Sequence, residues 1–379
     1  MDMNKISEMR AEFEPAVSTW TYLNAAACGL TPQFARTSME QWWDDKLTNG
    51  SVHYHEWEED ALSTKQKFAI LIHASRDEIA YTMNTSEGLN FAINGIQFKK
   101  GDNVVVNKYD FPSNFLPWLA LKQKGVEIRC MEITDRRIPI EHIESLIDER
   151  TKAVSISSVQ FKTGFRCDLQ GIGALCKEHG IYFVVDAIQS LGALEMNVKK
   201  YNIDILCTSC YKWLLGPDGI GFLYCDEEVV DEIATTNIGW MSTPDPWSFP
   251  TELELMKSAQ KFESGTLPWT LIYAVDPILD MFNSIGVHTI TDHIFRLLDH
   301  LIAELESRDM NILSPLKKDE RSGILIFDVK QRDALAEYYQ AHNIRISVRD
   351  GIRVSPHLYN NLEDVDVLIS HLDQFMEGL

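Results

Sequence analysis

A lysine and an aspartate follow two apolar segments in the middle of this 379-residue chain. Lys212 lies in the segment Ser209-Cys210-Tyr211-Lys212-Trp213, and Asp186 directly follows the apolar run 181–185, with Gln189 just beyond it. The spacing of the two along the chain is typical of one βαβ step. We therefore expect the amine and the carboxylate to lie at the ends of neighbouring buried strands.

An amine in this position can form a Schiff base with an aldehyde cofactor when its unprotonated form is accessible. Burial or a nearby positive charge lowers a lysine pKa enough to allow this. A buried carboxylate beside a pyridine nitrogen keeps that nitrogen protonated, so that the ring acts as an electron sink. Lys212 and Asp186 therefore predict an enzyme that uses pyridoxal 5'-phosphate. The alternative is a helix-capping aspartate and a solvated lysine, but the shared position at strand ends favours the catalytic interpretation.

Composition narrows the class of protein. The chain is 45% hydrophobic and 24% charged, which is typical of a globular protein, and its formal net charge of -21 argues against binding to nucleic acid or an anionic membrane. The first residues lack the apolar core of a signal peptide, and no apolar stretch reaches the roughly 18 residues of a membrane span. We expect a cytoplasmic enzyme with no membrane partner.

The cysteines do not indicate a metal or a disulfide framework. There are seven, an odd number, and they are scattered from Cys28 to Cys225. The spacing of Cys207 and Cys210 has no second pair, which a zinc site would require. We therefore expect no metal site.

Short apolar runs alternate with longer amphipathic segments through the middle of the chain. One amphipathic segment, residues 169–179, is a predicted helix that ends at Gly180. This alternation predicts an α/β fold with a mostly parallel sheet between helices, and ligands of such folds bind beyond the carboxyl ends of the strands. The predicted strands are residues 104–106, 126–128, 153–156, 182–185, 205–206 and 221–224.

The alternation of apolar runs and amphipathic segments gives way near residue 255 to longer helical segments. This change predicts a large cofactor-binding domain over 20–254 and a smaller α+β domain over 1–19 and 255–379. The proline-rich segment 243–250 is a loop that can cover the site. In the smaller domain we expect helices at 269–284, 287–307 and 363–376, and strands at 323–329 and 351–355.

From residues 22–27 to 353–360, the chain resembles the aminotransferase class V enzymes of fold type I, which include cysteine desulfurases, selenocysteine lyases, isopenicillin N epimerase and kynureninase. The resemblance implies that Lys212 forms the Schiff base, that Asp186 pairs with the pyridine nitrogen, and that Gln189 lies near the phenolic oxygen of the cofactor. It also implies that Phe111 stacks on the cofactor ring, where desulfurases usually have histidine. Gln160 falls where relatives place a side chain near the same oxygen.

The resemblance further implies a phosphate site and a substrate site. Thr85 and Ser86, at the start of a predicted helix, match the phosphate loop, and a helix N-terminus suits an anion. Ser209 and Tyr211 correspond to further phosphate ligands. Thr266 lies in a segment that reaches the phosphate of a neighbouring subunit, which implies a homodimer. Arg353 matches the arginine that holds the α-carboxylate of an amino-acid substrate, for which its planar fork of donors is suited.

The residues favour some reactions over others. Desulfurases usually carry a cysteine in a loop shortly before the carboxylate-binding arginine, and residues 343–353 contain none. We therefore expect an aminotransferase or a lyase acting on a small amino acid, with a desulfurase, a selenocysteine lyase or an epimerase as alternatives. A binding protein without turnover would be expected to lose Lys212, Asp186 or Arg353. A nicotinamide-dependent dehydrogenase would require G-x-G-x-x-G, which does not occur.

Overall fold

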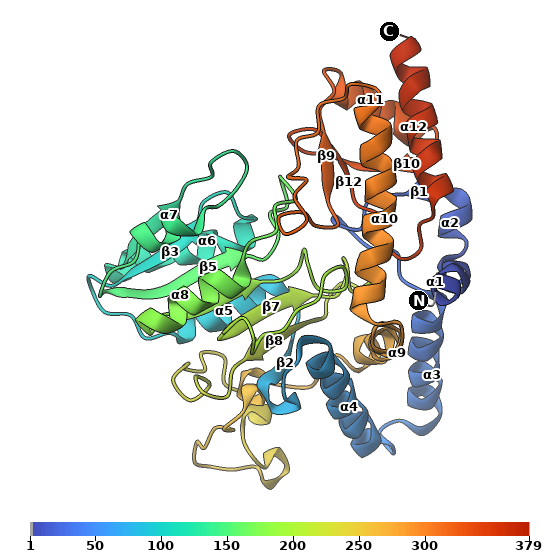
Figure 1. Ribbon diagram of the computed structural model, residues 1–379. Helices are drawn as coiled ribbons and strands as arrows, with labels where there is room; N and C mark the ends of the chain where they lie inside the picture. The colour runs from blue at the N-terminus through green and yellow to red at the C-terminus, as the bar shows by residue number, and fades with distance from the viewer. Residues whose placement is uncertain (1–2, 379) are drawn as a thin grey trace.

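The computed structural model describes residues 3–378, and a seven-stranded sheet forms its centre (Figure 1). The strand order is β2-β8-β7-β6-β5-β3-β4. Strands β4, β3, β5, β6 and β7 run parallel, whereas β8 is antiparallel to β7 and β2 is antiparallel to β8. The predicted mostly parallel sheet is confirmed. The strands are β2 (Ile79–Thr82), β3 (Asn103–Asn107), β4 (Glu127–Met131), β5 (Thr151–Ser157), β6 (Tyr182–Asp186), β7 (Ile205–Ser209) and β8 (Gly221–Cys225).

Helices cover both faces of this sheet because its central strands are apolar on both sides. Successive residues of a strand point to opposite faces, so Val105 packs into one apolar cluster with helix α8 (Leu169–His179), and Val104 packs into another with helix α5 (Thr85–Gly95). The predicted helix 169–179 is therefore confirmed. The Asp168 carboxylate caps it by accepting from the Gly171 N–H at 2.9 Å, and Gly180 ends it at φ 64°.

A second group of elements lies beside the large sheet, to the right in Figure 1. Helix α9 packs against α3 and α4, and α10 packs against α12. The small antiparallel sheet has the order β11-β12-β9. The elements of this group are α3 (Gln33–Asn49), α4 (Tyr54–Ile72), α9 (Trp269–Ile285), α10 (Val287–Glu306), β9 (Leu325–Phe327), α11 (Arg332–Ala341), β11 (Ser347–Val348), β12 (Ile352–Val354) and α12 (Leu362–Glu377).

The remaining elements are short. They are α1 (Met3–Met9), η1 (Arg10–Phe13), α2 (Ala16–Thr19), β1 (Thr21–Tyr22), η2 (Arg76–Glu78), η3 (Pro112–Asn114), α6 (Leu116–Ala120), η4 (Leu121–Lys124), α7 (Ile140–Ser145), η5 (Trp240–Ser242), η6 (Pro246–Ser248), η7 (Ala259–Phe262) and β10 (Ile344–Arg345). Within residues 3–378, no helix combines the length and the apolar character that crossing a membrane requires.

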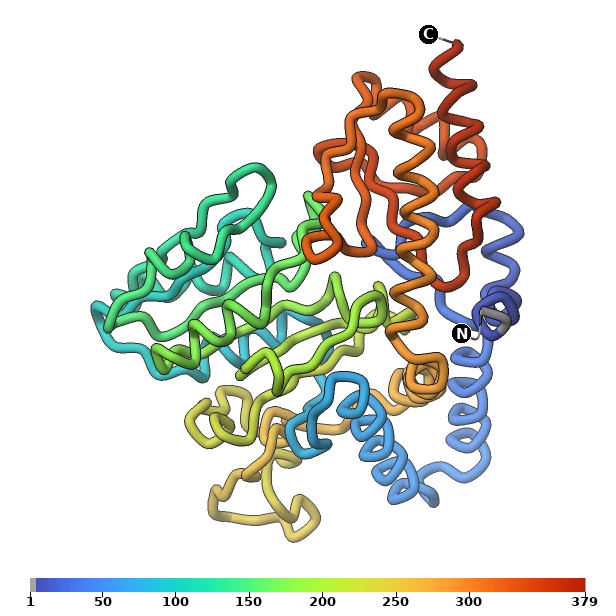
Figure 2. Tube along the Cα trace, viewed as in Figure 1, coloured from blue at the N-terminus to red at the C-terminus, as the bar shows by residue number. Residues whose placement is uncertain are grey.

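The N-terminal segment joins the C-terminal part of the fold. Strand β1 pairs in parallel with β10, and Asn24 forms a bridge with Ser355. In Figure 2 the blue N-terminal trace accordingly runs among the orange and red segments. The domain boundaries at residues 20 and 254 stay a prediction, and contacts cross both of them: β1 belongs with the C-terminal sheets, and η7 packs on β2. This crossing brings residues 24–29 to the carboxyl ends of the central strands, where Gly29 N–H donates to the Tyr211 carbonyl oxygen at 2.8 Å.

Candidate active site

Lys212 lies in a tight turn after β7 and is buried, with only 7% of its surface exposed. Two backbone hydrogen bonds fix the turn, from Leu215 N–H to the Lys212 carbonyl oxygen at 3.0 Å and from Gly216 N–H to that of Cys210 at 2.9 Å. Among the described residues, none accepts a hydrogen bond from the Lys212 amine. Its Nζ instead lies 5.6 Å from the centre of the Phe111 ring. The amine is therefore held in a buried position but is not engaged by a carboxylate.

The electrostatic setting of Lys212 favours its neutral form. Burial lowers the pKa of its amine, and the positive charges of Arg353 and Arg349 lower it further, while Asp186 opposes them. A lysine whose pKa lies below the ordinary value has a larger neutral fraction at physiological pH, and the neutral amine is the form that attacks an aldehyde.

Asp186 ends β6, in register with Cys207 on the neighbouring strand β7, and its side chain is buried. Its Oδ1 accepts from the Ile188 N–H at 3.0 Å. Burial raises the pKa of this carboxyl, against the lowering effects of the Ile188 N–H and of Lys212, and Asp110 adds a smaller increase. A buried carboxylate that lacks a directly bonded cation favours a protonated ring nitrogen beside it.

Phe111 follows β3 and is 46% exposed although it lies beside the buried lysine. Its ring meets Phe161 edge to face, with the centroids 5.5 Å apart and an interplanar angle of 83°. Phe161 therefore supports one side of the ring and leaves much of the remaining surface open. An open aromatic face beside a reactive amine is suited to stacking on a flat heteroaromatic ring.

Hydroxyl groups gather at the N-terminus of α5. The Thr85 N–H donates to Ser209 Oγ at 2.8 Å, the Thr85 and Ser209 hydroxyls lie 3.0 Å apart, and Ser86 Oγ donates to Ser113 Oγ at 2.7 Å. The helix has 11 residues, and in its first turn only the Ser86 N–H lacks an acceptor within residues 3–378, since the Glu87 N–H donates to Asn84 Oδ1 and the Gly88 N–H to the Asn84 carbonyl oxygen. Hydroxyls and a helix N-terminus together form a site for a phosphate.

Arg353 extends from β12 towards the loop that follows β5. Its Nη1 donates to the Phe161 carbonyl oxygen at 3.2 Å and its Nη2 to Ser347 Oγ at 3.4 Å. Its Nε is buried and has no partner within residues 3–378. Burial lowers the pKa of the guanidinium, with a further contribution from Arg349. A buried guanidinium that retains an unsatisfied donor suits a carboxylate ligand.

Two of the predicted cofactor contacts have other partners. Gln189 donates from Nε2 to the Ala26 carbonyl oxygen at 3.0 Å, and its Oε1 accepts from Trp213 Nε1 at 2.9 Å. Gln160 donates from Nε2 to Asp110 Oδ1 at 2.7 Å. Each glutamine lies in the loop after a central strand, but its side chain is hydrogen-bonded to other groups of the protein. The cofactor contacts predicted for them stay predictions.

The remaining two predicted residues lie at different depths. Tyr211 is half-buried, and its ring centre is 5.6 Å from Lys212 Nζ. Thr266 is exposed in the segment between η7 and α9, and the adjacent Gly265 lies near the Trp240 ring. The exposed position of Thr266 is compatible with the role in a neighbouring subunit that the resemblance implies.

Cys28 was not predicted as a site residue, but it is exposed and its thiol is within electrostatic range of Lys212. A Cβ atom added to Gly29 would clash with the Lys212 carbonyl oxygen, so this loop packs directly on the lysine turn. Burial of part of the side chain raises the pKa of the Cys28 thiol, as does Asp218, while Lys212 lowers it. The segment that resembles the family begins at residues 22–27, directly before Cys28. The position of Cys28 next to this segment is the feature of the sequence that could have identified it.

Asp110 was also missed. It is buried and accepts from Gln160 Nε2, from Asn107 Nδ2 at 2.7 Å, from Asn114 Nδ2 at 2.9 Å and from the Ser157 N–H at 2.8 Å. Burial raises the pKa of its carboxyl. This network fixes the loop that carries Phe111, which directly follows Asp110. A buried carboxylate with this many donors is a positioning residue.

The donor set fits pyridoxal 5'-phosphate. Lys212 would hold the aldehyde, Asp186 the ring nitrogen and Phe111 the ring face, while the hydroxyls at the start of α5 would hold the phosphate. Within residues 3–378, no group of three or more His, Cys, Asp or Glu side chains is placed to hold a metal ion. The mostly parallel sheet with a lysine and an aspartate at its strand ends defines a pyridoxal phosphate enzyme of fold type I.

The family is established by comparison with known proteins. The chain belongs to the aminotransferase class-V family, whose model matches residues 21–368. It is 30% identical to a probable cysteine desulfurase of Methanothermobacter thermautotrophicus, over 95% of this chain and 96% of that protein. The chain is therefore an enzyme of transferase or lyase type that depends on pyridoxal 5'-phosphate and acts on an amino acid.

Solved structures share the fold. The apo cysteine desulfurase of Thermococcus onnurineus NA1 aligns with a TM-score of 0.89 at 26% identity, covering 98% of each chain. The cystine C–S lyase C-DES, in complex with cysteine persulfide, aligns with a TM-score of 0.88 at 19% identity, covering 94% of this chain and 98% of that chain. At that identity, the second likeness concerns the fold alone.

Proposed function

We propose that the enzyme is an aminotransferase or lyase that labilises the α-carbon of a small amino acid, with Lys212 as both the cofactor anchor and the proton carrier. One observation carries this proposal: a buried amine with a lowered pKa and no hydrogen-bond acceptor among residues 3–378 faces an open aromatic ring. Such an amine is free to bond to an aldehyde and, once released, to take and return a proton.

Arg353 orients the substrate. Its guanidinium reaches the site from β12, and its Nε remains unsatisfied among the described residues. A carboxylate bound here satisfies that donor and fixes the amino acid in one orientation. The small antiparallel sheet thus supplies the substrate contact, while the large sheet supplies the anchor.

Each site residue has a separate role in the proposed reaction. The bound cofactor supplies an electron sink for the carbanion at the substrate α-carbon. The Asp186 carboxylate holds a proton at the ring nitrogen, and Phe111 keeps the ring in place. Lys212 takes the α-proton at its Nζ. Return of that proton to a different carbon gives transfer, return to the opposite face of the α-carbon gives epimerisation, and loss of a leaving group from the substrate β-carbon before any return gives elimination.

The hairpin before Arg353 supports a reaction that needs no protein cysteine at that point. Strands β11 and β12 pair at Val348 and Ile352, so only residues 349–351, Arg-Asp-Gly, form the turn. A turn this short neither contains a thiol nor has the length of a mobile loop. The observed geometry therefore favours an aminotransferase or a lyase.

A second candidate, cysteine desulfuration, is favoured by the position of Cys28. Cys28 is an exposed residue of the N-terminal loop that packs on the lysine turn, and its thiol lies within electrostatic range of Lys212. In this reaction the sulfur of a cysteine substrate bonds to Cys28 Sγ, the substrate Cβ–S bond breaks, and Cβ takes a proton. The products are alanine and a persulfide on Cys28, from which an added thiol releases sulfide.

Absorbance and product analysis test the proposal together. The purified enzyme is expected to show a yellow band that shifts when its amino-acid substrate is added. A 2-oxo acid with an aminated acceptor identifies transamination, pyruvate with ammonia and sulfide identifies lyase chemistry, alanine with sulfide identifies desulfuration, and inversion of the α-carbon alone identifies epimerisation. A protein that gains no band with added pyridoxal phosphate would overturn the proposal.

Three variants assign the roles. Lys212→Ala should abolish the band shift and lower turnover by about 10²–10⁴-fold or more, as for loss of a general acid–base. Asp186→Asn should bind the cofactor but lower turnover by about 10²–10³-fold, since it loses a preorganised charge. Cys28→Ser should abolish alanine formation if the second candidate is correct, and should leave transamination or elimination unchanged if it is not. The exposed Lys122→Ala serves as the control for all three.

We also propose a cytoplasmic homodimer. The cytoplasmic location is supported by the cysteines, because all seven are free, which suits a reducing compartment. Large apolar side chains are exposed next to site residues in the chain, namely Met83, Phe111 and Leu116, and in the segment that precedes Thr266, namely Trp240, Phe249 and Leu253. Light scattering of the purified enzyme should give twice the chain mass, and Leu116→Asp should give monomers. A monomeric wild-type enzyme with full activity would exclude the shared site.

A further inference from the structure

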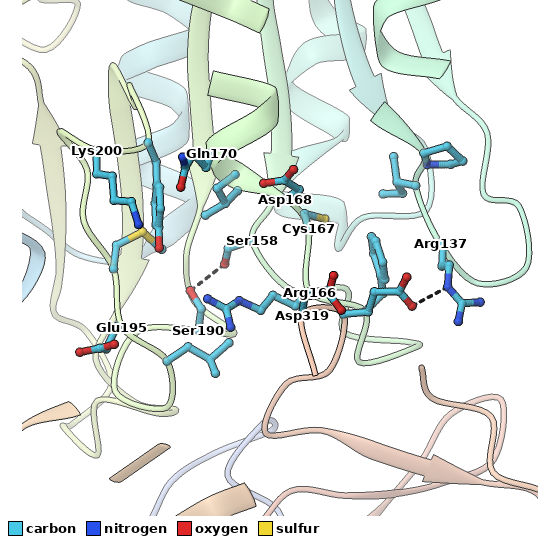
Figure 3. Close-up of a pocket in the computed structure, with 18 residues that line it drawn as sticks. Arg137, Ser158, Arg166, Cys167, Asp168, Gln170, Ser190, Glu195, Lys200 and Asp319 are labelled. Carbon is cyan, nitrogen blue, oxygen red and sulfur yellow. Dashed lines mark hydrogen bonds and ion pairs between the residues drawn. The ribbon is translucent and has the colours of Figure 1, made fainter. Parts of the chain in front are cut away.

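A cavity of about 600 Å³ lies apart from the candidate active site, between helix α8 and the loop that carries Asp319 (Figure 3). It is lined by residues after β5 and β6 and by the segment 194–201, and Lys212, Phe111 and Arg353 are not among its lining residues. A volume of this size is within the range of about 300–1,000 Å³ in which proteins hold small ligands.

The cavity lies next to the turn that carries Asp186. Ser158 and Ser190 line it and are buried, and their hydroxyls lie 2.7 Å apart. The Ser158 N–H donates to the Asp186 carbonyl oxygen at 2.9 Å, and Ser190 Oγ donates to the Ala187 carbonyl oxygen at 3.1 Å. An occupant would therefore contact the reverse side of the turn that carries Asp186.

Arg166 provides an unused cation in this cavity. Its backbone N–H donates to the Glu320 carbonyl oxygen at 2.7 Å, but its half-buried guanidinium has no hydrogen bond or ion pair within residues 3–378. Figure 3 shows the side chain extended towards Ser190. A half-buried guanidinium without a partner is costly unless a ligand or water satisfies its donors.

Charged side chains of both signs line the cavity. Among the lining carboxylates, Asp168 caps α8, and Glu320 accepts from Arg137 Nε at 2.7 Å. The Lys200 ammonium lies over the Tyr201 ring, 5.7 Å from its centre, so it also remains available to a ligand. Of the four lining carboxylates, Asp168 and Glu320 are therefore occupied within the protein, Glu195 lies 3.9 Å from His288 Nδ1, and Asp319 has no hydrogen bond or ion pair within residues 3–378. The half-buried Arg166 is thus the group that can anchor an anion here.

The rest of the wall is apolar. It is formed by Ile138, Phe165, Leu169, Leu194 and Met196. These side chains suit the body of a ligand, while Arg166 suits its charged end. The geometry points to a second binding site, for a small carboxylate with an apolar body, held at Arg166. The site does not rest on the reaction proposed above, because binding at this cavity requires no turnover.

Calorimetric titration of the holoenzyme with 3-phenylpropionate tests this site. The probe has no amino group and so cannot react with the cofactor, and 3-phenylpropan-1-ol is its neutral match. We expect saturable binding of the carboxylate and at least tenfold weaker binding of the alcohol. Absence of binding, or equal binding of the two probes, would overturn the inference.

Two arginine variants separate this site from the active site. Arg166→Met should weaken binding by about 10–100-fold, the loss expected for a charge-assisted hydrogen bond, whereas Arg353→Met and the surface variant Arg36→Met should leave it unchanged. Loss of binding in Arg353→Met but not in Arg166→Met would assign the probe to the active site and refute the inference. Unchanged melting temperatures establish that each variant is folded, and a crystal of the complex must show the probe carboxylate at Arg166.

Discussion

The amine of Lys212 lies 5.6 Å from the centre of the Phe111 ring, although the two residues follow different strands of the central sheet. Lys212 follows β7 and Phe111 follows β3, and both strands end at the same edge because they run parallel. The ring is kept in place from the side by Phe161, which it meets edge to face. This arrangement leaves an open aromatic surface directly beside the reactive amine.

Replacing Phe111 by leucine should weaken cofactor binding without abolishing it. A stacked aromatic pair contributes about 0.5–1.5 kcal/mol beyond its buried area, which corresponds to an increase of about 2–12-fold in the dissociation constant. Titration of the apoenzyme with pyridoxal phosphate, followed by absorbance, measures this constant. Phe249→Leu, at an exposed position in the segment 246–258, should leave it unchanged. An unaltered constant in Phe111→Leu would show that the ring does not stack on the cofactor.

The rate at which the apoenzyme captures pyridoxal phosphate should rise with pH through the pKa of Lys212. Burial and the charges of Arg353 and Arg349 lower this pKa, so the midpoint should lie below the value of about 10.4 for a free lysine. Removing the Arg349 charge relieves repulsion of the ammonium form, so the pKa rises and the neutral fraction at a given pH falls. Arg349→Met should therefore shift the midpoint to higher pH, measured by stopped-flow absorbance. A midpoint that stays in place, or moves to lower pH, would contradict this electrostatic account.

The fold could be predicted because most of its elements have a strong local pattern. The predicted helices at 269–284, 287–307 and 363–376 correspond to α9, α10 and α12 within a few residues. Their apolar positions repeat at helical spacing, which reflects one buried face. The pairing of β1 with β10 could not be read in the same way. Each strand has two residues, and their partners lie more than 300 positions apart in the chain, so no local pattern specifies them.

The site could be predicted where a side chain follows a strand, and not where it depends on a loop crossing the fold. Asp186 ends β6 and Lys212 follows the adjacent parallel strand β7, so their proximity results from the strand order. Cys28 reaches the same place only because the N-terminal segment pairs with the C-terminal sheets. The orientation of Gln160 depends on the buried carboxylate of Asp110, which no spacing in the sequence indicates.

Replacing Arg353 by methionine should raise the KM of the amino-acid substrate more than it lowers kcat. The guanidinium binds the carboxylate in the ground state and in the transition state alike, and removal of such uniform binding appears in KM. A charge-assisted hydrogen bond contributes about 1.5–3 kcal/mol, or about 10–100-fold in KM. Arg345→Met, at an exposed position on β10, is the matched control. A fall in kcat with unchanged KM would show that Arg353 acts on the reacting atoms and does not hold the substrate.

A buried ion pair near the site makes a separate prediction about stability. Lys65 Nζ on α4 lies 2.8 Å from Glu263 Oε1, which also accepts from the Tyr81 N–H at 2.8 Å, and Lys65 and Glu263 are buried. Lys65→Met leaves the Glu263 carboxylate buried without its cation, which typically costs about 3–5 kcal/mol of folding free energy. The double variant Lys65→Met/Glu263→Gln removes the stranded charge and keeps an acceptor for Tyr81. It should therefore be more stable than the single variant.

Urea unfolding followed by circular dichroism compares the two variants with the wild type. We expect the lowest midpoint for Lys65→Met and an intermediate one for the double variant. Lys67→Met is the matched control, because Lys67 pairs with Asp276 and Asp280 at a more exposed position on the same helix, where ion pairs contribute about 0–1 kcal/mol. If the single and double variants unfold at the same midpoint, the loss comes from the missing lysine side chain and not from an uncompensated charge. In that case the contact between α4 and the segment that leads to Thr266 depends on packing alone.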